Sequence, residues 1–193
     1  MVCRTLLVTI LLVQLPLAAG PQNKSPRHGL VSLPQGGVTR IPSPDGNWTL
    51  IFECPNDCAS RKLWIEDEAS HTRRLINDYE RNLTISWAPD SKSFFVNDQY
   101  GSNGALCYVY DPLSLKVTDL ASLLARGDPN VTEFLKAGHS YLEAKRWVNS
   151  RELLVILFGH FDSPRSRGFT MQYRVGLDGR VQKLWHHPDE EPQ

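Results

Sequence analysis

The sequence lacks the features by which many functional classes are recognised. Its 193 residues include 21 basic and 21 acidic side chains, and this even balance gives no reason to expect nucleic-acid binding. There is no H-E-x-x-H motif, no phosphate-binding glycine loop and no dinucleotide fingerprint. The best approximation to a G-x-S-x-G nucleophile elbow is GHSYL at Gly138–Leu142, which lacks the second glycine. We therefore expect no cofactor and assign no catalytic or metal-binding residues.

Long apolar runs are missing after the first twenty residues. The longest later run, Leu153–Phe158, has the length of one buried strand, whereas a membrane-spanning helix needs about 20 apolar residues. Residues 1–20 have the layout of a secretory signal peptide, with Arg4, an apolar stretch over Leu6–Val13, and small residues at Ala18–Gly20. The expected chain is secreted or periplasmic and has no membrane span after cleavage.

Cysteine is scarce, and only Cys54, Cys58 and Cys107 follow the predicted signal peptide. An odd number leaves at least one thiol unpaired or available to a partner chain. Cys54 and Cys58 lie in ECPNDC, where a disulfide would close a small loop in an oxidising compartment. Free buried thiols are the second interpretation. Metal binding is the third, because no further Cys or His pair has ligand spacing.

The sequence does contain a repeated phrase. SPDGNWTLIF at Ser43–Phe52 returns as APDSKSFFVN at Ala88–Asn97, and a divergent copy, VNSRELLVIL, occupies Val148–Leu157. In the first two copies the proline ring restricts φ, and the aspartate side chain can accept hydrogen bonds from nearby backbone N–H groups. We interpret Asp45 and Asp90 as turn residues and not as catalytic acids.

Short strands separated by turn signals fill the chain from Val38 onward. They form three units with one order: a turn, an apolar strand, a variable polar loop, an aromatic-rich strand and a tight turn. Trp87 and Trp147 precede the turn in units two and three, and we interpret both as core anchors. The predicted strands are Val38–Pro42, Trp48–Glu53, Lys62–Glu66 and Thr72–Ile76 in unit one, Leu83–Trp87, Ser93–Asn97, Leu106–Tyr110 and Lys116–Leu120 in unit two, and Tyr141–Val148, Glu152–Phe158, Phe169–Val175 and Arg180–Leu184 in unit three.

One segment between units two and three departs from this pattern. Leu120, Leu123 and Leu124 have helical spacing, and Asp128 can begin a second short helix that ends before Gly138. We expect a helical insertion that covers one edge of the sheet. The predicted organisation is a signal peptide at 1–20, a linker at 21–37, a β-repeat domain at 38–186 that includes the insertion at 121–138, and a tail at 187–193.

The units resemble the blades of TolB-like and dipeptidyl-peptidase-type β-propellers, the WD40-like or PD40 repeats. The resemblance rests on SPDGNWTLIF…LWIED and SWAPDSKSFFVND…LCYVYDPLSLKVTDL and extends over roughly residues 38–185. It implies an all-β fold of three four-stranded antiparallel blade-like repeats, a partial propeller with a short helical insertion before the third. Propellers typically have 4 to 8 blades. Three units could form an open array, a ring closed by homo-oligomerisation, or a rearranged sandwich.

Function is expected in the loops that differ between the units. A non-catalytic binding or scaffold module would present Glu53–Arg61, Asn97–Ala105 and Gly159–Gly168 to a protein or glycan partner. Exposed aromatic side chains among Trp48, Trp64, Tyr100 and Tyr108 would favour recognition.

The most site-like loop is GHFDSPRSRG. It offers His160 and Asp162, flanked by Arg165 and Arg167, to an anionic ligand. The alternative is a small hydrolase or metal-dependent enzyme on the same sheet. That alternative requires His139, His160 and nearby carboxylates to lie within about 10 Å of one another, because nucleophile and base must be in contact.

Overall fold

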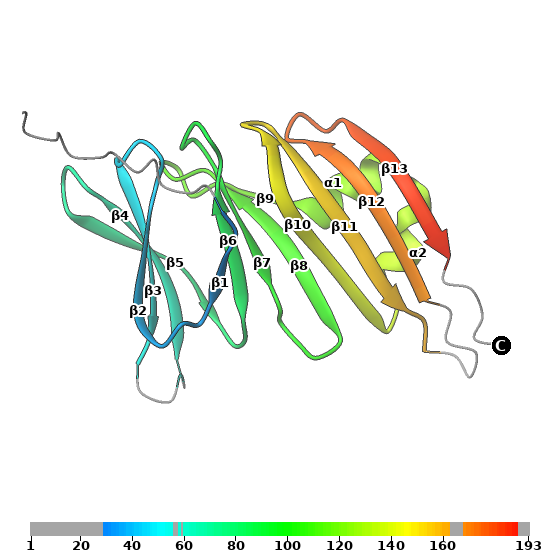
Figure 1. The fold of residues 1–193 in the computed structure, drawn as a ribbon, viewed down its shortest axis with the longest axis horizontal. Coiled ribbons are helices and arrows are strands. Elements are labelled where there is room, and N and C mark those ends of the chain that lie inside the picture. Colours follow the sequence, from blue (N-terminus) through cyan, green and yellow to red (C-terminus); the bar gives the residue numbers. More distant parts are fainter. Residues whose placement is uncertain (1–28, 56–57, 59, 163–167, 189–193) are drawn as a thin grey trace, which may run out of the picture.

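The computed structural model describes residues 29–55, 58, 60–162 and 168–188 (Figure 1). The fold is all-β, with two open sheets and a short helical segment. No helix within the described ranges is long and apolar enough to cross a membrane. The strands are β1 (Val31–Leu33), β2 (Gly37–Pro42), β3 (Trp48–Cys54), β4 (Arg61–Asp67), β5 (Thr72–Tyr79), β6 (Leu83–Trp87), β7 (Phe94–Asp98), β8 (Gly104–Tyr110), β9 (Val117–Asp119), β10 (His139–Asn149), β11 (Glu152–His160), β12 (Gly168–Gly176) and β13 (Val181–Pro188). The helices are α1 (Leu120–Gly127), the 3₁₀ turn η1 (Pro129–Val131) and α2 (Thr132–Leu135).

All twelve predicted strands are present, which confirms the all-β repeat, and the structure adds β1. This strand lies within residues 21–37, which the sequence predicted to be a linker. It pairs antiparallel with β6, opposite Leu83–Ile85, and Leu33 is only 2% exposed. At the other end, β13 extends to Pro188, beyond the predicted domain end at 186. The predicted signal peptide and residues 189–193 of the predicted tail lie outside the described residues.

In both repeated turns the aspartate has the predicted structural role. Asp45 Oδ1 accepts a hydrogen bond from the backbone N–H of Asn47, and Asp90 Oδ1 accepts one from that of Lys92, both at 3.1 Å. The two turns also contact each other, because the N–H of Asp45 donates to Ser91 Oγ at 3.0 Å. Asp45 and Asp90 are therefore turn residues, which confirms that prediction.

The two tryptophans join successive units through one repeated hydrogen bond. Trp87 Nε1 of unit two donates to the carbonyl of Ile41 in unit one at 3.1 Å. Trp147 Nε1 of unit three donates to the carbonyl of Ser86 in unit two at 3.2 Å. Ile41 and Ser86 hold equivalent places, each four residues before the turn aspartate of its unit. The indole groups thus set the spacing between units as well as filling the core.

Unit two is buried on both faces. Phe94 and Phe95 are consecutive and point to opposite sides of β7, yet both are fully buried. Phe94 belongs to the core shared with unit one, and Phe95 to the core shared with unit three and the helices. This arrangement explains why the middle copy of the repeated phrase has adjacent aromatic residues.

Units two and three form one continuous sheet instead of two separate blades. Strand β9 has three residues and pairs only with Tyr108–Tyr110 of β8. The other end of the same β8 edge pairs in parallel with β10, Gly104 opposite Ser140 and Ala105 opposite Tyr141. Unit one remains a separate sheet in the order β2-β3-β4-β5.

The helical insertion covers a face of the sheet and not an edge, which corrects the prediction. Leu120, Leu123, Leu124 and Val131 are buried in the same core as the inward-facing residues of β10, β11 and β12. Figure 1 shows α1 and α2 lying across the far side of these strands. The same core contains Phe95, Cys107 and Val109 of unit two, so the helices help to bury the apolar face of unit three that is turned toward unit two.

The third cysteine after residue 20, Cys107, is expected to be inert in the folded chain expressed without residues 1–20. It is fully buried in β8, and this burial raises the pKa of its thiol far above the usual range. Ellman's reagent should therefore detect no thiol in the native chain and one thiol per chain after denaturation without a reductant. Rapid labelling of the native chain, or three thiols in denaturant, would contradict this prediction. Cys107 is also too deeply buried in this conformation to cross-link a partner chain.

Candidate functional site

The strand ends that flank the variable loops lie along one edge of the molecule, the lower edge in Figure 1. These loops are the β3–β4, β7–β8 and β11–β12 connections, each of which joins the second and third strands of its antiparallel unit. The β5–β6 connection and the start of β10 reach the same edge. We refer to these segments together as the lower edge. Arg165 and Arg167, predicted to take part in ligand contacts, lie outside the described residues.

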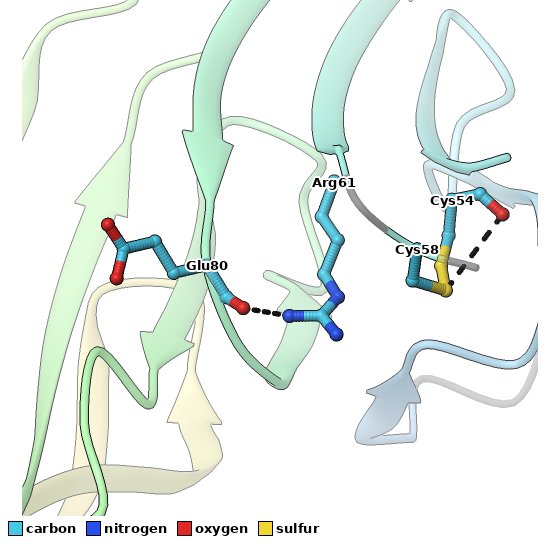
Figure 2. The surroundings of a disulfide bond; sticks show 4 residues. All are labelled: Cys54, Cys58, Arg61 and Glu80. Carbon is cyan, nitrogen blue, oxygen red and sulfur yellow. Dashed lines mark hydrogen bonds between the residues drawn. A yellow bond between two sulfur atoms is a disulfide. The ribbon is translucent and has the colours of Figure 1, made fainter.

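A disulfide lies at the base of the first variable loop (Figure 2). It joins Cys54, the last residue of β3, to Cys58, and their Cα atoms are 4.6 Å apart, within the range that a disulfide can bridge. Cys54 is 1% exposed and belongs to the core shared by units one and two. The bridge ties the loop that precedes Arg61 to this core.

A polar pocket of about 370 Å³ lies at the lower edge where the loops of units one and two meet. Arg61, the first residue of β4, reaches across to the β5–β6 connection, where its Nη1 donates to the Glu80 carbonyl. Figure 2 shows the Glu80 carboxylate pointing away from the guanidinium. The pocket is lined by Arg61, Glu80, Arg81, Asn82, Gln99 and Gly101.

The arginines of this pocket have unused binding capacity. The Nε of Arg61 is buried and has no hydrogen-bond partner among the described residues. Within the described part of the chain, neither Arg61 nor Arg81 forms an ion pair. Buried polar groups normally have partners, and a guanidinium binds carboxylate groups well. The pocket is thus chemically suited to an anionic group.

Of the four aromatic residues singled out, Tyr100 is the exposed one. It lies on the β7–β8 loop beside the pocket and is 46% exposed. Its ring lies over Gly104, where a Cβ atom would overlap the phenol. Trp48, Trp64 and Tyr108 are half-buried, and Trp64 Nε1 donates to the Glu53 carboxylate at 3.0 Å. One exposed aromatic side chain therefore adjoins the polar pocket.

Two histidines and an aspartate meet at the same edge in unit three. His139 begins β10 and His160 ends β11, and the two are directly paired across the strands. Their rings stack with centroids 4.0 Å apart, and His139 Nε2 lies 3.8 Å from Asp162 Oδ1. The sequence analysis paired His160 with Asp162 in a binding loop and named His139 only as a requirement of the enzymatic alternative. One ligand atom from each of His139, His160 and Asp162 lies within 4.8 Å of the others, so the distance of more than about 10 Å that would have excluded that alternative is not found.

A second cluster of the same size, Glu66, Glu68 and His71, has a different character. Arg40 forms ion pairs with Glu66 at 2.9 Å and with Glu68 at 3.3 Å, and Arg73 also pairs with Glu66. Hydrogen bonds from Arg40 and Arg73 lower the pKa of Glu66 below its usual value. These carboxylates already have cationic partners, so the cluster is a surface ion-pair network.

No family model matches the sequence, and no curated protein matches it. Solved structures do match. The β-propeller domain of the Trilobed protease from Pyrococcus furiosus, which has an open velcro topology, aligns at 15% identity with a TM-score of 0.50 over 77% of this chain and 43% of that one. TolB from Acinetobacter baumannii aligns at 14% identity with a TM-score of 0.36, over 80% of this chain and 43% of that one. Acylaminoacyl peptidase from Pyrococcus horikoshii aligns at 13% identity with a TM-score of 0.43, over 77% of this chain and 25% of that one.

The likeness concerns the fold alone at these identities. The chain spans less than half the length of these three structures. Its open blade-like sheets have a β-propeller fold in partial form, as the repeated phrase predicted. The chain is thus a propeller-like module.

Proposed function

We propose that this chain is an exported, non-catalytic binding module that holds a protein or glycan partner at its lower edge. The observation that carries the proposal is the polar pocket between units one and two, whose lining includes Arg61 and the exposed Arg81, neither of which forms an ion pair in the described part of the chain. A carboxylate bound beside these guanidinium groups would form charge-assisted hydrogen bonds with them. The signal-like residues 1–20 and the Cys54–Cys58 disulfide support export.

The lining of the pocket indicates the chemistry of the partner. Arg61 and Arg81 offer planar N–H groups that match a carboxylate. The amide side chains of Asn82 and Gln99 can orient the same ligand group. Tyr100 adds an exposed amphipathic ring of the kind that is common at binding surfaces. We expect a protein or glycan partner that presents a carboxylate next to a flat apolar surface.

Binding to arrays of acidic and neutral glycans and of acidic and neutral peptides tests the proposal. The exported chain should bind a subset of carboxylate-bearing probes. Arg81→Ala and Tyr100→Ala should each weaken that binding by about tenfold or more, as anchor residues do. Arg81 and Tyr100 are exposed, so neither change is expected to unfold the chain.

Matched controls are available on the opposite edge. Arg151 lies in the exposed β10–β11 turn, and Leu113 is 73% exposed in the β8–β9 turn. Arg151→Ala and Leu113→Ala should leave probe binding unchanged. The proposal fails if no carboxylate-bearing probe is bound, or if the opposite-edge variants lose as much affinity as the pocket variants.

A further inference from the structure

We propose that His139, His160 and Asp162 form a binding site for a divalent transition-metal ion of the zinc type. The site lies at the lower edge of unit three and is independent of the proposed partner pocket. One nitrogen from each histidine and one carboxylate oxygen lie within 4.8 Å of one another. Zinc bonds of about 2.0–2.2 Å to such ligands would place the ligand atoms roughly 3.3 Å apart in a tetrahedral site. Side-chain rotations that move the ligand atoms by about 1 Å would therefore bring all three within bonding distance of one ion.

The strand register brings the two imidazoles together. His139 and His160 are directly paired, and their ring planes are inclined by only 14°. Because an ion bound by an imidazole nitrogen lies in the plane of that ring, binding requires one of the two stacked rings to turn about its side-chain torsions, so that both nitrogens face one point beside Asp162. A Cβ atom on Gly159 would overlap the carbonyl oxygen of His139, so the glycine permits this close approach of β10 and β11.

The aspartate is positioned by its neighbours as well. Phe161, between the two ligands His160 and Asp162, packs against Phe134 and Phe169 with ring centroids 5.7 and 5.5 Å away. The packing of Phe161 fixes the backbone of the two neighbouring residues, His160 and Asp162. A Cβ atom on Gly138 would overlap the Asp162 carboxylate, so the carboxylate lies directly over this glycine. The donor set is thus supported from both strands.

The donor types select the ion. Two imidazole nitrogens and one carboxylate oxygen suit Zn²⁺ and similar borderline ions, whereas Mg²⁺ and Ca²⁺ prefer oxygen ligands alone. Three protein ligands leave a fourth position for water or for a group from a bound molecule. The side chains of His139 and Asp162 are 35% and 68% exposed, so an ion can enter from solvent.

Calorimetric titration of the metal-free exported chain with Zn²⁺ tests the site, and Co²⁺ absorption reports on coordination. One ion per chain is expected. His139→Gln, His160→Gln and Asp162→Asn should each weaken binding by at least about 100-fold, the upper range for loss of supporting interactions at metal sites. Gly138→Ala keeps all three ligands but displaces the carboxylate, and it should also weaken binding. Zn²⁺ should raise the melting temperature of the wild type and not that of His160→Gln.

Control variants separate this site from other histidines. His71→Gln removes the histidine beside carboxylates that Arg40 and Arg73 already occupy, and it should leave Zn²⁺ affinity unchanged. The double variant His186→Gln/His187→Gln should also bind as the wild type does. Asp162→Asn alters an exposed side chain and so tests binding even if a histidine variant is unstable. The proposal is overturned by an absence of saturable binding at about 100 µM Zn²⁺, by ligand variants that retain wild-type affinity, or by loss confined to the His186/His187 variant.

Discussion

Replacing Asn97 by alanine is expected to lower the free energy of unfolding by about 3 kcal/mol or more. Asn97 lies on β7 and is only 3% exposed. Its Nδ2 donates to Thr84 Oγ1 at 2.7 Å and to the Ala144 carbonyl at 2.9 Å, and its Oδ1 accepts the N–H of Ala144 at 2.8 Å. One buried amide thus satisfies both backbone groups of Ala144 in β10.

The size of the effect follows from what the substitution leaves behind. In Asn97→Ala, the buried carbonyl of Ala144 loses its partner and the N–H keeps only a weak contact with the Cys107 sulfur, and an unpaired buried group costs about 1–3 kcal/mol. Urea denaturation followed by circular dichroism measures the difference. Asn77→Ala, at an exposed strand position of unit one, is the matched control and should change stability by no more than about 0.5 kcal/mol. A loss below about 1 kcal/mol for Asn97→Ala would mean that water or a rearranged strand replaces the amide.

Replacing Trp87 by alanine is expected to cost about 3–5 kcal/mol. The side chain is 4% exposed, packs against Phe94 with the ring planes tilted and the centroids 4.9 Å apart, and donates to the Ile41 carbonyl. Trp87→Phe should cost less, about 1–3 kcal/mol, because it retains part of the packing and mainly leaves the carbonyl unpaired. Thermal and urea unfolding of both variants would separate the contribution of packing from that of the hydrogen bond.

Trp147 provides the comparison for this prediction. It makes the equivalent bond to the Ser86 carbonyl but is only half-buried. Trp147→Phe should therefore destabilise the chain less than Trp87→Phe does, since its hydrogen bond is only partly buried and water can replace the indole more readily there. Equal losses at the two positions would show that burial does not decide the strength of these inter-unit bonds.

Some properties of this protein were determined by local sequence alone. The prolines and aspartates of SPDG and APDS specify their turns through restricted φ and short side-chain bonds, whatever the rest of the chain does. Alternating apolar residues between such turns predicted all twelve strands of the three units. The repeated phrase also indicated the propeller-like fold. These signals involve neighbours only a few residues apart.

Other properties depend on contacts between distant residues. The pairing of β1 with β6 joins segments about fifty residues apart, and the signal for β1 was no more than Val31 and Leu33 alternating around Ser32. The union of units two and three depends on how much of the β8 edge the short β9 leaves free. The pocket at Arg61 combines loops from two units, so no single stretch of sequence contained it.

The histidine pair shows the distinction most clearly. Counting back from the β10–β11 turn, where Asn149 pairs with Glu152, a regular hairpin would place Tyr141 opposite His160. Two register shifts in β10, one directly after Ala144, bring His139 there instead. Asn97 of unit two binds the backbone of Ala144. The sequence by itself determined the turns, the strands and the blade-like units. Only the tertiary structure decided which histidines meet, because a β-bulge depends on contacts with another unit and leaves no local sequence pattern.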